Sequence, residues 1–327
     1  MRVGMLIPVL MVAAAGPAAA LPLAEHPPLQ QLVTTLVQED GFERGALERL
    51  FAQAEFKQSV IDAITRPAEK MPWSRYRPIF LTEQRIAGGV AFWRQHADLL
   101  ARAQAQHGVP AAVITAIIGV ETRYGAVTGN YRALDALTTL AVAGLSRSAF
   151  FSGELRELLL LGREERIDPI TVNGSYAGAL GLPQFIPSSY RAYAVDFDQD
   201  GRRDLLGSPA DAIGSVANYL RRHGWQAGGL ISAPATVSAQ AAALAAGGLK
   251  PQLTVQELRA RGVGDTLGEG AATLKAALIH LDGEHGDEYH LGFDNFYAIT
   301  RYNHSALYAM AVTQLAAAIA ERRAAEP

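Results

Sequence analysis

One carboxylate interrupts an otherwise apolar helical segment, AIIGVETRYG. In a helix of about 3.6 residues per turn, Glu121 shares a face with Ile114, Ile117 and Ile118. Apolar neighbours disfavour the charged form of a carboxyl group, so the pattern predicts a raised pKa and a proton donor near neutral pH. The alternative is a structural Glu121 paired to Arg123 or another cation, and the helix alone does not separate the two.

A second segment, residues 174–189, predicts a shaped loop next to such an acid. Its sequence GSYAGALGLPQFIPSS holds three glycines and two prolines, which exclude one regular helix and let a ligand approach the backbone. Its hydrogen-bonding and aromatic side chains include Ser175, Gln184, Tyr176 and Phe185, with Tyr190 just beyond. Hydroxyl-rich ligands need this mixture, and cleavage of a glycosidic bond uses one acid to protonate the leaving oxygen. Core packing is the alternative for the aromatic residues.

An acidic stretch resembles the start of an EF-hand calcium loop. Its carboxylates alternate and a glycine follows them: Asp196, Asp198, Asp200 and Gly201. The twelfth position of the loop is Gly207, which cannot supply the usual glutamate. Three clustered aspartates repel one another without a cation, which favours bound calcium over the alternative, a solvated acidic turn.

The composition limits the class of protein. The chain has 327 residues, 49% of them hydrophobic and 19% charged, which indicates a globular protein with room for more than one domain. A net charge of -3 without a long basic run argues against nucleic acid as a partner. The sequence contains no cysteine, which excludes disulfides, thiolate metal sites and a lipid-anchored cysteine. The eight histidines show no metal-binding spacing.

The first twenty residues predict a cleavable signal peptide. Arg2 gives the positive start, residues 3–15 the apolar segment, and residues 18–20 a run of alanines for cleavage. A membrane anchor is the alternative, but Pro8 and Gly16 interrupt a segment that is short for a span. We therefore expect export, and in a Gram-negative host a periplasmic location.

Periodicity predicts a mainly α protein with a small β part, an α+β fold class. Helices are expected over residues 29–37, 86–106, 110–124, 133–145, 151–165, 212–223 and 305–323, and β-like runs over 276–281 and 296–300. Ser208 and the proline after it predict the start of the helix over 212–223.

Four separated blocks in order resemble the lytic murein transglycosylase B family. They are GVETRYG (119–125), GALGLPQFIPSSY (178–190), DAIGSVANYL (211–220) and FYAITRYNHS (296–305). The resemblance runs from about residue 42 to about residue 315. It implies a lysozyme-like catalytic core over 108–228, a helical domain over 21–107 plus 296–327, and a small mixed β domain over 229–295.

The resemblance also implies an activity on the glycan strands of peptidoglycan. Members of the family cleave the β-1,4 bond between N-acetylmuramic acid and N-acetylglucosamine without adding water and leave a 1,6-anhydromuramic end. Glu121 matches the single catalytic glutamate, which acts first as acid and then as base. No catalytic cofactor is implied, and we expect a monomer, with cell-wall enzyme complexes left open. The alternatives are a lysozyme-like peptidoglycan hydrolase and a non-catalytic module that binds peptidoglycan or calcium.

Further residues carry over from the family as sugar-binding or acid-orienting groups. They are Ser175, Gln184, Tyr219, Tyr302, Asn303 and Tyr308, with Phe185 added from the loop. Asn303 could instead cap the last helix, and a tyrosine within a helix is more often core. Arg147 matches a basic residue of the family's cleft, whereas Ser146 stands where a second arginine is expected.

The resemblance completes the calcium loop as well. The metal ligands implied are Asp196, Asp198, Asp200, the carbonyl of Arg202 and a later carboxylate, Asp211. The helix start at Ser208 explains Asp211 equally well.

Overall fold

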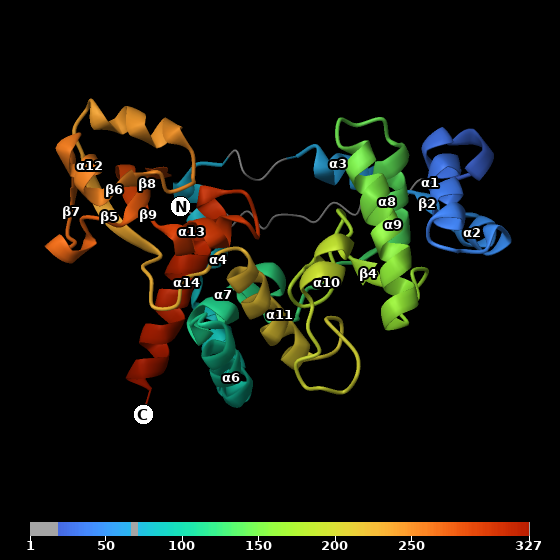
Figure 1. Cartoon of the computed structure of the whole chain (residues 1–327), viewed down its shortest axis with the longest axis horizontal. Helices are drawn as coiled ribbons and strands as arrows, with labels where there is room; N and C mark the ends of the chain where they lie inside the picture. Colours follow the sequence, from blue (N-terminus) through green and yellow to red (C-terminus); the bar gives the residue numbers. More distant parts are fainter. Residues whose placement is uncertain (1–18, 67–70, 327) are drawn as a thin grey trace, which may run out of the picture.

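The computed structural model describes residues 19–66 and 71–326 and shows a mainly α protein with one five-stranded sheet (Figure 1). The helices are α1 (Pro27–Gln38), α2 (Arg44–Phe51), α3 (Gln58–Ile64), α4 (Trp73–Phe80), α5 (Glu83–Gln95), α6 (Ala97–His107), α7 (Ala111–Thr122), α8 (Ala133–Val142), α9 (Ser148–Glu165), α10 (Pro187–Tyr193), α11 (Pro209–Arg222), α12 (Val255–Ala260), α13 (Asp294–Thr300) and α14 (Ala306–Ala325). Short 3₁₀ helices are η1 (Leu23–Glu25), η3 (Ala241–Gly247) and η4 (Glu269–Ala271). The strands are β1 (Ala19–Ala20), β2 (Glu55–Phe56), β3 (Tyr131–Arg132), β4 (Asn173–Gly174), β5 (Ser232–Val237), β6 (Leu253–Thr254), β7 (Val263–Asp265), β8 (Lys275–Gly283) and β9 (Gly286–Gly292).

Helix α7 lies at the centre of the fold and packs against α5, α6, α11 and α14. It is apolar all round, as expected of a helix buried on every side, and only Glu121 and Ala112 among its residues are not fully buried. The helix ends at Thr122, because Arg123 and Tyr124 both have left-handed backbone angles, with φ of 50° and 61°. The expected end after Tyr124 was therefore two residues too late.

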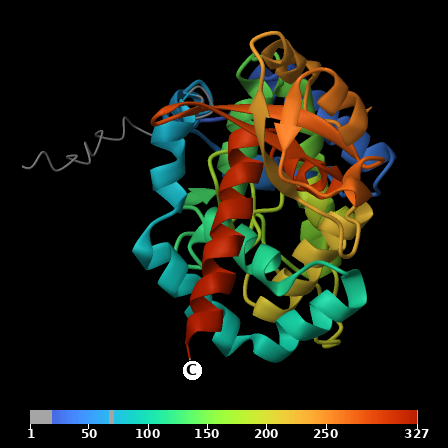
Figure 2. The ribbon, with the colours of Figure 1, turned by 90° about the vertical axis from the view of Figure 1, so that its left-hand side faces the viewer.

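Helix α14 crosses the molecule beside α7 and α5 and is the long red helix in Figure 2. Its first turn is fixed by Ser305, whose hydroxyl accepts a hydrogen bond from the backbone N–H of Tyr308. This cap sets Tyr308 in the first turn of α14, beside the end of α7.

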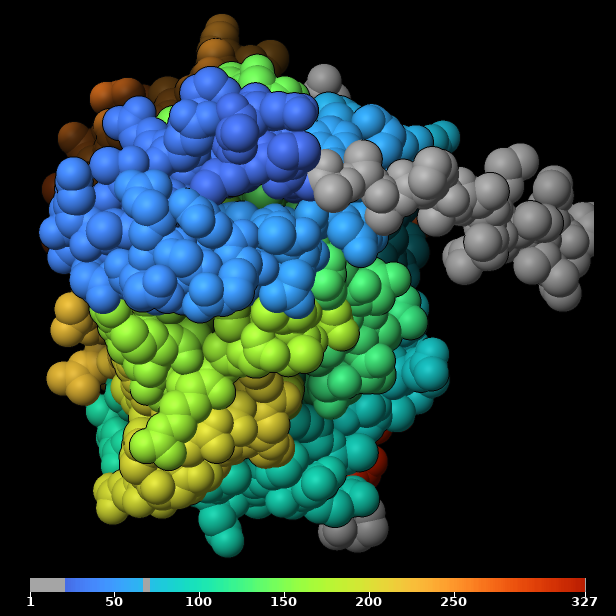
Figure 3. All heavy atoms as spheres, turned by 90° about the vertical axis from the view of Figure 1, so that its right-hand side faces the viewer, coloured from blue at the N-terminus to red at the C-terminus, as the bar shows by residue number. Residues whose placement is uncertain are grey.

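The N-terminal helices divide between two places in the fold. Helices α1 and α3 pack against α8, and α1 also packs against α9, at the end of the molecule that Figure 3 shows in blue and green. Helices α4 and α5 instead pack against α14, and α6 packs against α7 and α11. The expected helical domain over 21–107 plus 296–327 is thus spread over two sets of contacts, and the domain boundaries stay a prediction.

The sheet is antiparallel throughout, with the order β6-β8-β9-β5-β7. Strand β8 is buried on both faces: Ile279 and Leu281 join the main core, whereas Leu278 joins a smaller core with Val255 and Leu258 of α12. The strand expected over 276–281 is confirmed within β8.

The second β-like run, 296–300, was wrong, because these residues form α13. Phe296 and Ile299 favour strands by composition, but at helical spacing they bury one face of a short helix in the main core, next to α14. Tertiary packing overrides propensity here.

Two features bear on the expected leader. Residues 1–18 lie outside the described residues, and Ala19–Ala20 form β1, which pairs with β2. Within residues 19–66 and 71–326, no single helix is long and apolar enough to cross a membrane; α6 and α7 satisfy length and composition only as a pair, and the chain bends by 114° between them.

Candidate active site

Glu121 lies in the last turn of α7, in the position that the sequence indicated. The hydroxyl of Tyr308 donates a hydrogen bond to Glu121 Oε1 at 2.6 Å. Burial raises the pKa of Glu121 to about 7, and the hydrogen bond from Tyr308 lowers it in part. Glu121 forms no ion pair with any residue that the structure describes, so Arg123, which is exposed, does not neutralise it. The result is a partly exposed carboxyl group that exchanges its proton near neutrality.

The loop over 174–189 is tied to the end of α7. Thr122 Oγ1 donates to the carbonyl of Leu182 at 3.0 Å and accepts from the N–H of Gly125 at 3.1 Å. Gly181 has a φ of +71°, and a Cβ there would lie 2.1 Å from the carbonyl oxygen of Leu205. Only glycine fits this approach, so the loop is held against the residues beyond the acidic stretch.

The two polar residues of the loop differ in where they point. Ser175 Oγ accepts backbone hydrogen bonds from Ala177 and Ala179, so this hydroxyl shapes the loop. Gln184 has a left-handed φ of 50°, and its Nε2 donates to the carbonyls of Thr128 and Gly181 at 3.0 and 2.8 Å. The amide of Gln184 is therefore fixed at the wall of a cavity.

Aromatic side chains form that wall. The ring of Phe185 lies 5.4 Å from that of Tyr219 and 5.7 Å from that of Tyr302. The hydroxyl of Tyr302 donates to the carbonyl of Pro183 at 2.5 Å, and burial raises the pKa of Tyr302, so it stays a neutral donor. Phe185 is itself buried, so it supports the tyrosines.

The cavity beside this wall has a volume of about 810 Å³. Six of the expected substrate-binding residues line it: Arg147, Gln184, Phe185, Tyr219, Tyr302 and Asn303. Glu121, Tyr308 and Ser175 are not among the lining residues; Tyr302 lines the cavity and its ring stacks on that of Tyr308 with centroids 6.3 Å apart. Within the described part of the chain, no aspartate or glutamate lines the cavity.

Two of the open alternatives can now be compared with the geometry. Ser305 caps α14, so Asn303 is not the capping side chain and lies at the cavity instead. The guanidinium carbon of Arg147 lies 4.6 Å from the ring centroid of Phe150, and both residues line the cavity. Ser146 is exposed in the turn before α9.

Sequence reasoning missed several residues of the cavity. The ring of His223 stacks on Tyr219 at 3.9 Å, and burial lowers the pKa of His223. Its place four residues after Tyr219 on a helical pattern was a usable signal. Glu154, a buried acid behind the wall, accepts hydrogen bonds from Ser188 N and Ser188 Oγ at 2.9 and 2.7 Å. Nothing local in the sequence marks that contact.

The chain and its fold have clear relatives among known proteins. A family model described as Transglycosylase SLT domain matches residues 24–317. The chain belongs to the transglycosylase SLT domain family. Membrane-bound lytic murein transglycosylase B of Escherichia coli (strain K12) is 44% identical over 310 residues, which cover 92% of this chain and 84% of that protein.

Two solved structures of family members are similar throughout. Soluble lytic transglycosylase SltB1 from Pseudomonas aeruginosa is 48% identical, with a TM-score of 0.85 over 90% of this chain and 99% of that chain. Escherichia coli lytic transglycosylase Slt35 in complex with calcium is 42% identical, with a TM-score of 0.85 over 94% and 97% of the two chains. These matches confirm the family resemblance and the lysozyme-like, mainly α fold class.

In this family member the acidic loop is folded on itself. Oxygen atoms of Asp196, Asp198 and Asp211 lie within 4.8 Å of one another. Ser208 caps α11 through the N–H of Asp211, whereas the buried Asp211 carboxylate accepts from Phe197 N and Asp204 N at 2.6 and 2.7 Å. Asp211 therefore serves both as a cap position and as a loop carboxylate.

Two other expected ligands of the loop lie differently. Asp200 stands outside the group of three and accepts a hydrogen bond from the N–H of Arg202 at 2.9 Å. The guanidinium of Arg202 donates to the carbonyl of Glu165 at 3.4 Å. A metal-binding role for Asp200 and for the carbonyl of Arg202 stays a prediction.

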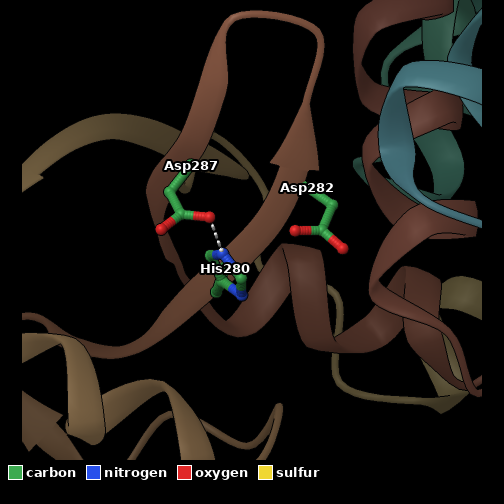
Figure 4. A group of neighbouring side chains, drawn as sticks. All are labelled: His280, Asp282 and Asp287. Carbon is green, nitrogen blue, oxygen red and sulfur yellow. Dashed lines mark hydrogen bonds and ion pairs between the residues drawn. The ribbon is translucent and has the colours of Figure 1, made fainter.

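A second group of ligand-type side chains lies on the β8–β9 hairpin (Figure 4). Asp282 and Asp287 are opposite each other in the strand register, and His280 Nε2 lies 2.8 Å from Asp287 Oδ1. The hairpin brings the three together, which residue spacing alone did not indicate. All three are exposed, and an ordinary surface ion pair accounts for the His280 contact, so we assign this group no function.

Proposed function

We propose that this chain is a peptidoglycan lytic transglycosylase in which Glu121 is the single acid and base. The observation that carries the proposal is a desolvated carboxyl group with a pKa raised to about 7. It is hydrogen-bonded to Tyr308, whose ring stacks on Tyr302 at the wall of a cavity that no described carboxylate lines. Its relatives support the reaction class, since the Escherichia coli protein is named a lytic murein transglycosylase. Hydrolysis by the usual two-carboxylate routes needs a partner acid, and no other carboxylate is among the influences on the pKa of Glu121.

The reaction needs two proton transfers through one carboxyl group. Protonated Glu121 donates its proton to the oxygen that links C1 of N-acetylmuramic acid to C4 of N-acetylglucosamine, and the C1–O bond breaks. The acetamido group of the substrate stabilises the positive charge at C1. The Glu121 carboxylate then takes the proton of the C6 hydroxyl while that oxygen bonds to C1. The products are a free C4 hydroxyl and a 1,6-anhydromuramic end, and no water is consumed.

The residues around the cavity have distinct roles in this proposal. Tyr308 orients the carboxyl group of Glu121 through its 2.6 Å hydrogen bond. Gln184, Tyr219, Tyr302 and Asn303 contact the sugars, on a surface backed by Phe185, while Ser175 holds the loop in shape. Arg147 is one of two arginines that line the cavity, with Arg301, and offers a cation to the lactyl or peptide carboxylates of the strand.

We also propose a structural calcium ion in the acidic loop. The carboxylates of Asp196, Asp198 and Asp211 fit a hard cation, which prefers oxygen ligands, and the related Slt35 has been solved in complex with calcium. In the proposed site, Asp200 and the carbonyl of Arg202 complete the ligand set. No step of the reaction uses the ion, because Glu121 supplies the proton.

For the location, we infer export to the periplasm on a cleaved leader. The support is the charge and apolar pattern of residues 1–20 together with the cell-envelope relative, which is named membrane-bound. N-terminal sequencing of the protein recovered from a periplasmic fraction would test this, and a retained Met1 would contradict it. A monomer is the proposed oligomeric state.

The decisive experiment is product analysis on purified sacculi. Mass spectrometry should find anhydromuramic ends, one water lighter than the reducing ends that a hydrolase leaves. The Glu121→Gln variant should bind glycan and cleave none. Reducing ends would favour the lysozyme-like hydrolase, and binding without cleavage by the unmodified protein would favour a non-catalytic module.

A further inference from the structure

A buried arginine holds the end of the helix that carries Glu121. Arg85 lies in the first turn of α5 and is only 8% exposed. Its Nη1 donates to the carbonyls of Gly119 and Val120 at 2.5 and 3.3 Å, and its Nη2 to the carbonyl of Ile79 at 3.4 Å. Arg85 forms no ion pair with any described acid. Its guanidinium donates to backbone oxygens, and its central carbon lies 5.1 Å from the ring centroid of Phe80.

The end of α7 needs such a donor. The last carbonyls of a helix have no N–H partner within the helix, and a cation there is favourable. Because α7 closes with two left-handed residues, the N–H of Arg123 returns to Gly119 O and the N–H of Tyr124 reaches back to Ile118 O. Val120 O, directly before Glu121, is left to Arg85.

Tyr124, just after α7, also bonds to Arg85 of α5. The hydroxyl of Tyr124 donates to the carbonyl of Arg85 at 2.7 Å. Its ring lies against Gly88, Gly89 and Gly119, where an added Cβ would meet Tyr124 at 2.9 Å or less. Helix α5 and the last turn of α7 are thus fixed to each other at the residues next to Glu121.

We propose that Arg85 is a positioning residue for the cleavage reaction: its planar guanidinium fixes the last turn of α7 so that the carboxyl group of Glu121 keeps its hydrogen bond to Tyr308. The inference rests on the proposed function, because it assumes that Glu121 is the acid. Arg85 acts through geometry. The influences on the pKa of Glu121 are burial and the Tyr308 hydrogen bond, and the Arg85 charge is not among them.

The test compares Arg85→Lys with wild type on purified sacculi, well below the melting temperature. Lysine keeps the charge but lacks the planar fork that spans these three carbonyls. We expect kcat to fall about 100-fold, as for a misplaced catalytic group, with KM within about twofold. We also expect the alkaline limb of kcat/KM to move to higher pH, because a looser Tyr308 contact no longer lowers the pKa of Glu121.

A double-mutant cycle sharpens this test. In a Tyr308→Phe background the hydrogen bond is already absent, so Arg85→Lys should move the alkaline limb no further. The matched control is Arg259→Lys in the β domain, where a guanidinium also bridges a carboxylate, Asp265, and a carbonyl, Leu267 O. That control should lower the melting temperature and leave both kcat and the limb unchanged.

Three results would overturn the inference. The first is that Arg85→Lys keeps the kcat and the alkaline limb of the wild type. The second is that Arg85→Lys moves the alkaline limb further in the Tyr308→Phe background. The third is that Arg259→Lys changes kcat and the alkaline limb as much as Arg85→Lys does. If Arg85→Lys does not fold, Tyr124→Phe is the second variant, because it removes only the hydroxyl that contacts Arg85 O. We expect a several-fold lower kcat and an alkaline limb at higher pH. No change in either quantity would overturn the proposal. Wild-type product analysis and Glu121→Gln test the enzymatic function separately, so that function survives a failure here.

Discussion

Tyr308 and Glu121 are 187 residues apart in the chain, yet the Tyr308 hydroxyl lies 2.6 Å from Glu121 Oε1. The contact joins the first turn of α14 to the last turn of α7. A donor to a carboxylate stabilises its charged form, whereas burial destabilises it, and burial is the larger influence on Glu121. The pKa near 7 results from these two opposing effects.

Tyr308→Phe should separate the two effects. The variant keeps the buried ring but loses the donor, so the pKa of Glu121 should rise further and the alkaline limb of kcat/KM should move up by about one pH unit. Steady-state rates from pH 5 to pH 9 would measure this. Tyr190→Phe is the control, because that hydroxyl bonds to Arg203 O and Leu205 N and not to Glu121. An unchanged limb in Tyr308→Phe would contradict the role of the hydrogen bond.

Glu121→Gln should make the protein more stable at alkaline pH. Because burial raises the pKa of Glu121 from 4.5 to about 7, the folded state binds its proton more tightly than the unfolded state does. The contribution of Glu121 to the free energy of unfolding is complete below pH 4.5. It is lost as the pH rises to about 7, and the total loss is about 3 kcal/mol. Glutamine does not titrate, so it escapes this loss. Denaturant unfolding should therefore give Glu121→Gln a higher free energy of unfolding than wild type at pH 8, and the difference should shrink toward pH 4.5.

The exposed Glu48 gives the control for this comparison. Glu48→Gln should track wild type at both pH values. A constant difference between Glu121→Gln and wild type across the range would mean that Glu121 is not desolvated in the folded protein.

The carboxylate itself could be predicted because its signal is local. An apolar helix with one acid indicates desolvation of that acid, and the raised pKa of Glu121 at the end of α7 bears this out. The end of the helix could not be predicted. Gly125 is the residue type that commonly follows a helix, so the helix was expected to include Arg123 and Tyr124. The left-handed angles of Arg123 and Tyr124 accompany contacts between the end of α7 and α5. Arg85 and the glycines of α5 that contact the Tyr124 ring make these contacts, and they are distant from α7 in the sequence.

The tyrosines of the site had no local signal of their own. Tyr219 and Tyr308 were expected from family resemblance, because periodicity gives a helical tyrosine no role beyond the core. Tyr302, between two helices, was expected from the same resemblance. The strand expected over 296–300 shows the same limit: its residues favour strands, and packing makes them a helix. Asp211 was ambiguous for a different reason, since its N–H and its carboxylate serve two contacts at once.

Calcium should raise the melting temperature, and chelator should lower it. A ligand at about 100 times its Kd stabilises the folded state by about 2.7 kcal/mol. Asp198→Asn should abolish most of this shift, because it removes a carboxylate from the group with Asp196 and Asp211. Asp98→Asn, in the first turn of α6, is the exposed control. If calcium raises the melting temperature of Asp198→Asn as much as that of wild type, the ion binds at another place. If calcium does not raise the melting temperature of wild type, the proposed site is contradicted.

Gly181→Ala should destabilise the loop and reduce cleavage together. The added Cβ would sit 2.1 Å from Leu205 O at a φ of +71°, so the segment must move away from the acceptor that holds Leu182 N. Movement also takes Gln184 from the carbonyl of Gly181. We expect a loss of about 3 kcal/mol in the free energy of unfolding, measured by denaturant titration, and a lower kcat/KM.

Gly41→Ala isolates the backbone cost of that change. Its φ of +69° is nearly the same, but nothing lies within 4 Å of the added Cβ. This variant should lose only about 1 kcal/mol, from the left-handed angle alone, and keep full activity. If both alanine variants lose the same stability, the close approach to Leu205 O does not hold the loop, and Gln184 owes its position to other contacts.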